Sequence, residues 1–218
     1  MTNGFEIYFI DTLNNYPRRK VAGFFTQEEL QMRINRQLDS QSLLEVENNT
    51  EIAGRAYQIA ATRAFVEAAA NKRRKMLIVQ ATGTGKTRVA INIVNILFKA
   101  NWAKNVLFLA DRTALVKQAK NAFQEFFSKT VPLCNLTENK DDPSTSRIIF
   151  STYPTMMNYI DKFKENGQPF FTPAHFELII IDESHRGIYQ HYQDIFNYFD
   201  SILLGLTATP KSEVDRNT

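Results

Sequence analysis

Two short stretches of this 218-residue sequence hold residue types whose spacing could carry out phosphate chemistry. In the first, the apolar segment 76–80 runs into Ala-Thr-Gly-Thr-Gly-Lys-Thr at 81–87, and an amphipathic stretch follows. Glycines let a backbone fold so that several N–H groups point at one anion, and the positive end of a following helix adds to the attraction. Lys86 is then placed to reach the β- and γ-phosphates of a nucleotide, and the Thr87 hydroxyl to ligate Mg²⁺.

The loop departs from the strict phosphate-loop pattern at one position. That pattern has glycine at position 80, where this chain has Gln80. The alternative is a chance glycine turn, and the strand before it and the amphipathic helix after it count against that interpretation. We expect Lys86 to be exposed, because it follows a loop. The residues expected to bind the phosphates are Thr82, Gly83, Thr84, Gly85, Lys86 and Thr87.

The second stretch is an apolar run, 178–181, that ends in two adjacent carboxylates. Burying such a pair is costly unless a metal or a polar network lies beside it. Asp182 is placed to hold Mg²⁺, directly or through water, and Glu183 to orient and deprotonate an attacking water. The alternative is an exposed pair of turn acids, which a phosphate loop upstream in the same sheet disfavours. We therefore expect Glu183, Lys86 and Asp182 to be catalytic.

Both stretches belong to a regular alternation of helical and apolar segments that begins near residue 54. Such an alternation implies crossover connections and an α/β fold, with a parallel sheet covered by helices on both faces. In these sheets ligands bind at the carboxyl ends of the strands. The expected strands are 76–80, 105–110, 147–150, 178–182 and 202–206, and the expected helices are 56–70, 86–100, 114–127, 155–164 and 189–198, with a polar loop over 135–146.

Residues 1–53 differ in character and form a short α+β lead segment. The alternating residues 5–10 predict a strand, and Thr26 followed by Glu29 is the pattern of a helix capping box. This segment is too small to be a domain of its own. We therefore divide the chain into a lead segment, 1–53, and one larger domain, 54–218.

Bulk composition excludes some classes of protein and leaves others open. The single cysteine, Cys134, excludes an internal disulfide and favours a reducing cytoplasm. No apolar run approaches the roughly 20 residues that a membrane-spanning helix needs. The net charge of +3 is weak support for a polyanionic partner, because an unremarkable surface would give the same value.

The order of these motifs resembles the first RecA-like domain of superfamily 2 helicases. The motifs, which cover about three quarters of the chain, are Tyr57-Gln58, the loop 81–87, Leu-Phe-Leu-Ala-Asp-Arg at 107–112, Ser-Thr-Tyr at 151–153, Asp-Glu-Ser-His at 182–185 and Leu-Thr-Ala-Thr-Pro at 206–210. The resemblance implies a RecA-like, P-loop NTPase sheet of five or more strands. It also accounts for Gln80, because the loop of this superfamily reads A-x-T-G-x-G-K-T.

A narrower resemblance is to the motor subunit of type I restriction–modification enzymes. It rests on Thr-Asn-Gly at 2–4, Arg-Ala-Tyr-Gln at 55–58 and Asp-Glu-Ser-His-Arg at 182–186. It implies ATP and Mg²⁺ as cofactors, translocation along double-stranded DNA, and methyltransferase and specificity subunits as partners, with no membrane. It further implies a nuclease domain before residue 1 and a second RecA-like domain, both outside this sequence.

The resemblance also assigns roles to single residues. Gln58 would read the adenine edge, with Arg55 and Tyr57 beside the base. His185 would couple hydrolysis to domain movement through Thr207 and Thr209. Contacts to the DNA backbone, which carry no sequence information, would come from residues just beyond strand ends; these are Arg112, Thr113, Ser151 and Thr152.

Three interpretations stay open at this point. The parent is a restriction translocase, or another superfamily 2 enzyme such as a repair helicase or remodeller, or the chain is a nucleotide-binding module without turnover. Superfamily 2 motors receive arginine fingers from the second domain, and such fingers contribute about 10³–10⁵ in rate. We therefore expect this chain alone to bind nucleotide with little turnover.

Overall fold

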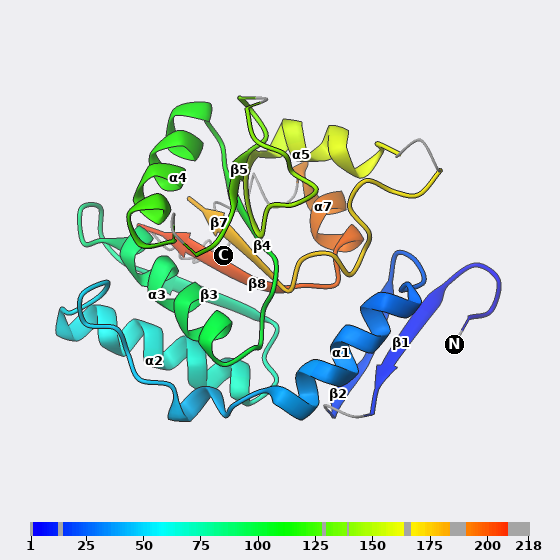
Figure 1. Ribbon diagram of the computed structural model, residues 1–218, viewed down its shortest axis with the longest axis horizontal. Coiled ribbons are helices and arrows are strands. Elements are labelled where there is room, and N and C mark those ends of the chain that lie inside the picture. The colour runs from blue at the N-terminus through cyan, green and yellow to red at the C-terminus, as the bar shows by residue number, and fades with distance from the viewer. Residues whose placement is uncertain are drawn as a thin grey trace, which may run out of the picture.

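A six-stranded parallel sheet forms the centre of the molecule (Figure 1). The computed structural model describes residues 2–12, 15–127, 130–138, 140–163, 167–183 and 191–208. The strands follow the order β3-β8-β7-β4-β6-β5, and every neighbouring pair is parallel. Their bounds are β3 (Lys75–Val79), β4 (Val106–Ala110), β5 (Leu133–Asn135), β6 (Ile148–Thr152), β7 (Leu178–Asp182) and β8 (Ile202–Thr207). The α/β fold predicted from the sequence is confirmed.

Helices cover both faces of this sheet, because its strands are apolar on both sides. One face packs against α2 (Ala56–Ala70), α3 (Lys86–Lys99) and α4 (Thr113–Phe127), and the other against α5 (Tyr153–Ile160) and α7 (Gln193–Tyr198). Alternate residues of β4 divide between the two cores: Phe108 belongs to the first and Leu107 to the second. Phe108 meets Phe123 of α4 with ring centroids 5.8 Å apart, so this helical aromatic is a core residue.

The sequence did not predict two of the strands. β5 has only three residues, too few for a periodic signal, and the polar loop expected over 135–146 begins inside it. β2 (Tyr16–Val21) contains Pro17 and three basic residues, a composition that does not indicate a strand. Its partner β1 (Ile7–Asp11) pairs with it as an antiparallel hairpin apart from the main sheet. Such a two-stranded ribbon tolerates proline and charge because solvent meets its outer face.

The lead segment continues from this hairpin into α1 (Gln27–Asp39) and a 3₁₀ turn, η1 (Leu43–Glu45). The capping box is confirmed: Thr26 Oγ1 accepts a hydrogen bond from the Glu29 amide at 3.2 Å, and Glu29 Oε2 accepts one from the Thr26 amide at 2.7 Å. Leu43 is 1% exposed and joins the core beside α2, which anchors the end of the lead segment. Among the helices of the described residues, none has both the length and the apolar character that crossing a membrane requires.

The largest differences from the expected helix bounds are in α5 and α7. α5 stops at Ile160, four residues before the predicted end, and α7 is described from Gln193. The predicted start of that last helix, residues 189 and 190, lies outside the described residues.

Candidate nucleotide-binding site

The glycine loop joins β3 to α3 through backbone that other residues rarely adopt. Gly83 has a φ of 76° and Gly85, the N-cap of α3, a φ of 89°. A Cβ at position 85 would also lie 2.6 Å from the side-chain nitrogen of Gln58, which is too close for any real contact. The left-handed backbone therefore favours glycine at position 85, and any side chain there would also have to displace the Gln58 amide group.

Gln58 supports this loop from the first turn of α2. Its Nε2 donates to the carbonyl of Thr84 at 2.9 Å, and its Oε1 accepts from the Arg55 amide at 3.3 Å. The Tyr57 hydroxyl donates to the same Thr84 carbonyl at 3.0 Å, and Arg55 Nη1 donates to that hydroxyl at 2.9 Å. The three residues assigned to the base by resemblance are thus brought together, and in this structure they bind one another and the loop.

A hollow of about 350 Å³ lies beside these residues, within the range of small-molecule sites. Arg88 forms part of its wall and donates to the carbonyls of Glu51 and Ile52, at 3.3 and 3.2 Å, which ties the preceding loop to α3. Arg88 was not among the residues predicted from the sequence. It could have been found from its position, because it lies two residues after Lys86 on the helix that begins at the loop. The lining residues are Thr50, Glu51, Gly54, Arg55, Gln58, Gly83, Thr84, Gly85 and Arg88.

Lys86 is less exposed than expected. Its side chain is only 11% exposed, because Lys86 begins α3 and turns toward β7 instead of into solvent. The ammonium lies 3.6 Å from Oε1 of Glu183 and donates to the Gln80 carbonyl at 3.4 Å. The expectation of an exposed lysine was therefore wrong. The structure does bring Lys86 and Glu183, 97 positions apart in the sequence, to one edge of the sheet.

The two carboxylates lie where β7 ends. Glu183 has a φ of 51°, uncommon for a residue other than glycine, and its amide donates to Asp182 Oδ1 at 3.1 Å. Burial, followed by the negative charge of Glu183, raises the pKa of Asp182 above its usual range, although Lys86 opposes the change. A carboxylate whose charge is disfavoured by its surroundings gains from a nearby cation. The pair can thus bind a divalent metal and hold a water beside it.

Of the three residues assigned to coupling hydrolysis to domain movement, only Thr207 lies within the described residues. Thr207 ends β8 between the loop strand and the acidic strand, is 2% exposed, and its carbonyl accepts the Gln80 amide at 2.9 Å. His185 and Thr209 lie outside the described residues.

The four residues assigned to DNA divide into two pairs. Arg112 and Thr113 follow β4 at the surface, and the Arg112 side chain is 80% exposed beside Asp111. Ser151 and Thr152 were expected just beyond a strand end. They are instead the last two residues of β6, and both are buried. Strand β6 runs two residues further than predicted, because Ser151 and Thr152 still pair with Leu109 and Ala110 of β4; Thr152 is also the N-cap of α5.

The glycine loop follows β3, and the Asp-Glu pair lies at the end of β7, with β8 between these two strands in the sheet. This arrangement defines a RecA-like domain of the superfamily 2 helicase type. The chain belongs to the family described as "Type III restriction enzyme, res subunit", whose model matches residues 51–212. It is 38% identical over 164 residues to the EcoAI type I restriction enzyme endonuclease subunit of Escherichia coli, with 72% of this chain and 19% of that protein covered. It is 29% identical over 186 residues to the EcoKI subunit of strain K12, with 74% and 16% covered.

Solved structures show the same architecture. A fragment described as an HsdR subunit of a type I restriction enzyme from Vibrio vulnificus YJ016 matches with a TM-score of 0.57 and 26% identity, over 98% of this chain and 38% of that one. The Hef helicase domain of Pyrococcus furiosus gives a TM-score of 0.53 and 26% identity, over 77% and 36%. The chain spans about a fifth of the length of the curated relatives it matches.

Proposed function

We propose that this chain is the ATP-binding motor domain of a DNA translocase, the restriction subunit of a type I restriction enzyme. The observation that carries the proposal is the meeting of the glycine loop, Lys86 and the Asp182-Glu183 pair at one edge of a parallel sheet. In this proposal residues 54–218 bind the nucleotide, and residues 1–53 connect the motor to other parts of a longer subunit. The similarity to type I endonuclease subunits supports this choice over a repair helicase or remodeller.

The residues of the candidate site fit a nucleoside triphosphate with its bound metal ion. The left-handed glycines leave the loop amides free of side-chain bulk, and α3 directs its positive end at the loop. The hollow beside Gln58 and Arg88 has the volume for a base. Asp182, together with the hydroxyl of Thr87, would hold Mg²⁺, which when bound neutralises charge that develops on the phosphates.

The positions of Lys86 and Glu183 indicate which part of ATP hydrolysis each residue would carry out. Lys86, now paired with Glu183, would exchange that carboxylate for the phosphate oxygens when nucleotide enters. Glu183, released from the lysine and 30% exposed, would orient a water and accept its proton. Lys86 therefore has two partners that compete for it, and nucleotide binding itself would free the general base.

The Gln58 amide would bind the Thr84 carbonyl when the site is empty and the adenine base when nucleotide is bound. Its amide holds the Thr84 carbonyl here, so contact with an adenine edge requires that hydrogen bond to break or to be shared. Arg55 and Tyr57 would flank the base from the same turn of α2. For DNA, we assign backbone contacts to Arg112 and Thr113 and no longer to Ser151 and Thr152, because both of these side chains are buried at the end of β6. His185, Thr207 and Thr209 remain our assignment for coupling. Double-stranded DNA and the methyltransferase and specificity subunits are the partners proposed for the full-length protein in the cytoplasm.

Measurement of ATP hydrolysis with and without DNA tests this function. We expect these 218 residues to bind ATP or ADP with Mg²⁺ by calorimetry and to turn ATP over below about 1 s⁻¹, the low end of ordinary enzyme rates. The full-length subunit should hydrolyse ATP faster when duplex DNA is added. Failure of the chain to bind nucleotide would contradict the site, and DNA-independent hydrolysis by the full-length subunit would contradict the translocase.

A further inference from the structure

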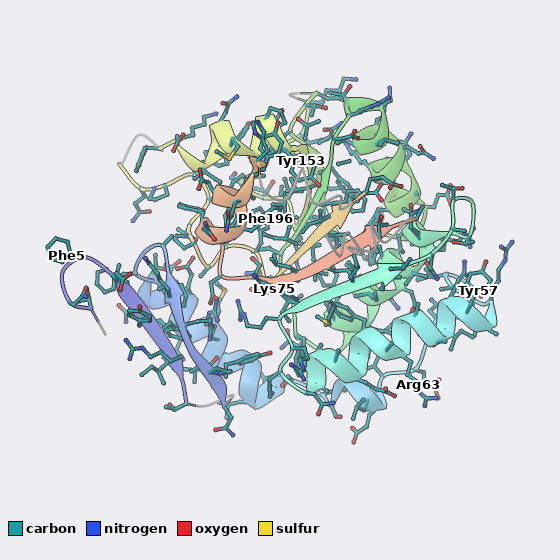
Figure 2. All side chains as sticks on the ribbon, turned by 180° about the vertical axis from the view of Figure 1, so that it is seen from behind. Phe5, Tyr57, Arg63, Lys75, Tyr153 and Phe196 are labelled. Atoms are coloured by element: carbon teal, nitrogen blue, oxygen red, sulfur yellow. The ribbon has the colours of Figure 1, made fainter. Side chains whose placement is uncertain are left out.

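A buried carboxylate at the amino ends of β3 and β8 binds three arginines, which come from β2, from α1 and from the loop that precedes β3. Asp200, whose side chain is 4% exposed, accepts from Arg19 of β2 at 2.6 and 2.8 Å, from Arg33 of α1 at 3.3 Å and from Arg74 at 2.6 Å. These contacts fasten the lead segment to the sheet. They lie at the opposite end of the strands from the glycine loop; in Figure 2, Lys75 at the start of β3 lies near the lead hairpin and Tyr57 at the far end of α2.

The cluster has more hydrogen-bond donors than it has acceptors. A carboxylate offers about four acceptor sites, and Asp200 uses four for the three guanidinium groups, each of which carries five N–H donors. Nη1 of Arg19 is buried and meets no acceptor among the residues that the structure describes. The Tyr16 side chain also lines the adjoining cavity, and burial raises the pKa of its hydroxyl above the usual range. A buried donor such as Arg19 Nη1, with no partner, points to a missing acceptor.

Positive charge is also in excess around an adjoining cavity of about 110 Å³. Four cationic side chains line it against three carboxylates. Burial, and then repulsion by Arg19 and Arg33, lower the pKa of Arg74 although Asp200 acts against this. Lys72 lies over the rings of Tyr16 and Trp102, 5.2 and 5.4 Å from their centroids, at the rim. The charged lining residues are Asp11, Arg19, Arg33, Lys72, Arg74, Glu177 and Asp200.

We propose that this cavity is a binding site for a small oxyanion, a single phosphate group, held by Lys72, the Tyr16 hydroxyl and the arginines that Asp200 fixes in place. A cavity of this size would hold several waters, so it has room for one tetrahedral anion. Guanidinium groups bind phosphate in a fixed fork, and here Asp200 already orients three of them. The anion supplies the missing acceptor and the missing negative charge. The site is separate from the candidate nucleotide site and independent of its function.

Thermal melting with inorganic phosphate tests the site in a chain that carries Lys86→Ala, which removes the lysine of the glycine loop. At constant ionic strength, phosphate should raise the melting temperature in a saturable way, and chloride should not. In the same background Lys72→Gln should weaken the apparent affinity at least tenfold, and Tyr16→Phe several-fold. Lys99→Gln, which removes one exposed charge at the end of α3, should leave the affinity unchanged. Circular dichroism at the start of each titration establishes that every variant is folded.

Two results would overturn the proposal: equal effects of phosphate and chloride, or the same affinity in the Lys72→Gln and Lys99→Gln chains. The phosphate could come from solution or from the end of a nucleic acid, and a second arm separates these sources. A 5′-phosphorylated trinucleotide and its unphosphorylated form are compared in the same melting assay. Tighter binding of the phosphorylated form than of inorganic phosphate identifies a nucleic-acid end, and weaker binding identifies the free anion.

Discussion

The ammonium of Lys86 lies 3.6 Å from the carboxylate of Glu183, so the residue we assign to the phosphates is paired with the residue we assign to the water. The pair joins the start of α3 to the end of β7 across the intervening strand β8. A substitution on either side therefore changes the surroundings of the other. The two residues nevertheless have different proposed tasks, and their variants should fail in different ways.

Lys86→Ala should abolish nucleotide binding while the chain remains folded. The lysine attracts phosphate charge, whereas its partly hydrated pair with Glu183 contributes about 1 kcal/mol or less to the free energy of unfolding. Calorimetric titration with ADP and Mg²⁺ measures the first effect, and thermal melting without nucleotide the second. Lys99→Ala, on the exposed end of the same helix, serves as the control. A collapse in melting temperature for Lys86→Ala would make Lys86 a structural residue.

Glu183→Gln should keep nucleotide binding and stop hydrolysis in the full-length subunit. The amide preserves the shape of the side chain but cannot accept a proton from water. Calorimetric binding and steady-state phosphate release on the same preparation separate the two properties. If binding disappears together with turnover, Glu183 is instead a metal ligand or a structural residue.

Gly85→Ala should remove nucleotide binding by distorting the loop. The new Cβ would meet Gln58 Nε2 at 2.6 Å, and the left-handed backbone adds a strain of about 1–2 kcal/mol. Combining it with Gln58→Ala removes the collision but not the strain, so in denaturant unfolding the double variant should lose less stability than the sum of the two single losses. Strictly additive losses would show that the two residues do not meet as described.

Asp200→Asn should lower the free energy of unfolding by about 3–5 kcal/mol, because three arginines lose their buried counter-charge. Burial alone would raise the pKa of Asp200, but the hydrogen bonds of Arg19 and the charges of Arg74, Arg19 and Arg33 outweigh it and hold the pKa below its usual range. A depressed pKa gives stability that is present above the unfolded value of about 3.9 and is lost as the pH falls through the folded value.

Urea unfolding between neutral and acidic pH checks this dependence. The wild-type chain should lose stability below about pH 4, and the Asp200→Asn chain, already destabilised, should show a flatter profile there. Asp142→Asn is a matched control, because Asp142 is exposed and bonds only to its own turn. Equal acid sensitivity of the wild-type and Asp200→Asn chains would contradict the assignment.

The chain should bind DNA weakly and without sequence preference. Each neutralised phosphate adds about 0.9 to the slope of log affinity against log salt, and a net charge of +3 with a few surface contacts suggests a slope of about two to three. Arg112→Ala should reduce this slope by about one, uniformly across sequences. Fluorescence anisotropy over several salt concentrations measures it. A clear preference for one sequence would show that the chain recognises bases.

The sequence by itself determined the α/β class, the parallel sheet and the two chemical motifs. Motif residues close together in the chain, such as Gly83, Gly85 and Lys86, encode their own loop, and apolar runs such as 178–181 need cover on both faces. The capping box of Thr26 and Glu29 was equally local, since both partners lie within one helical turn. These features depend on neighbours in the chain, which a sequence displays directly.

The tertiary structure decided which distant groups meet. That Lys86 is largely buried against Glu183, that Gln58 restrains the Thr84 carbonyl, and that Asp200 binds Arg19, Arg33 and Arg74 all depend on crossovers that bring residues 26 to 181 positions apart into contact. The short strand β5 likewise exists only because β6 offers it a pairing edge. Such contacts are set by packing and by the geometry of the parallel sheet, and no local pattern in the chain records them.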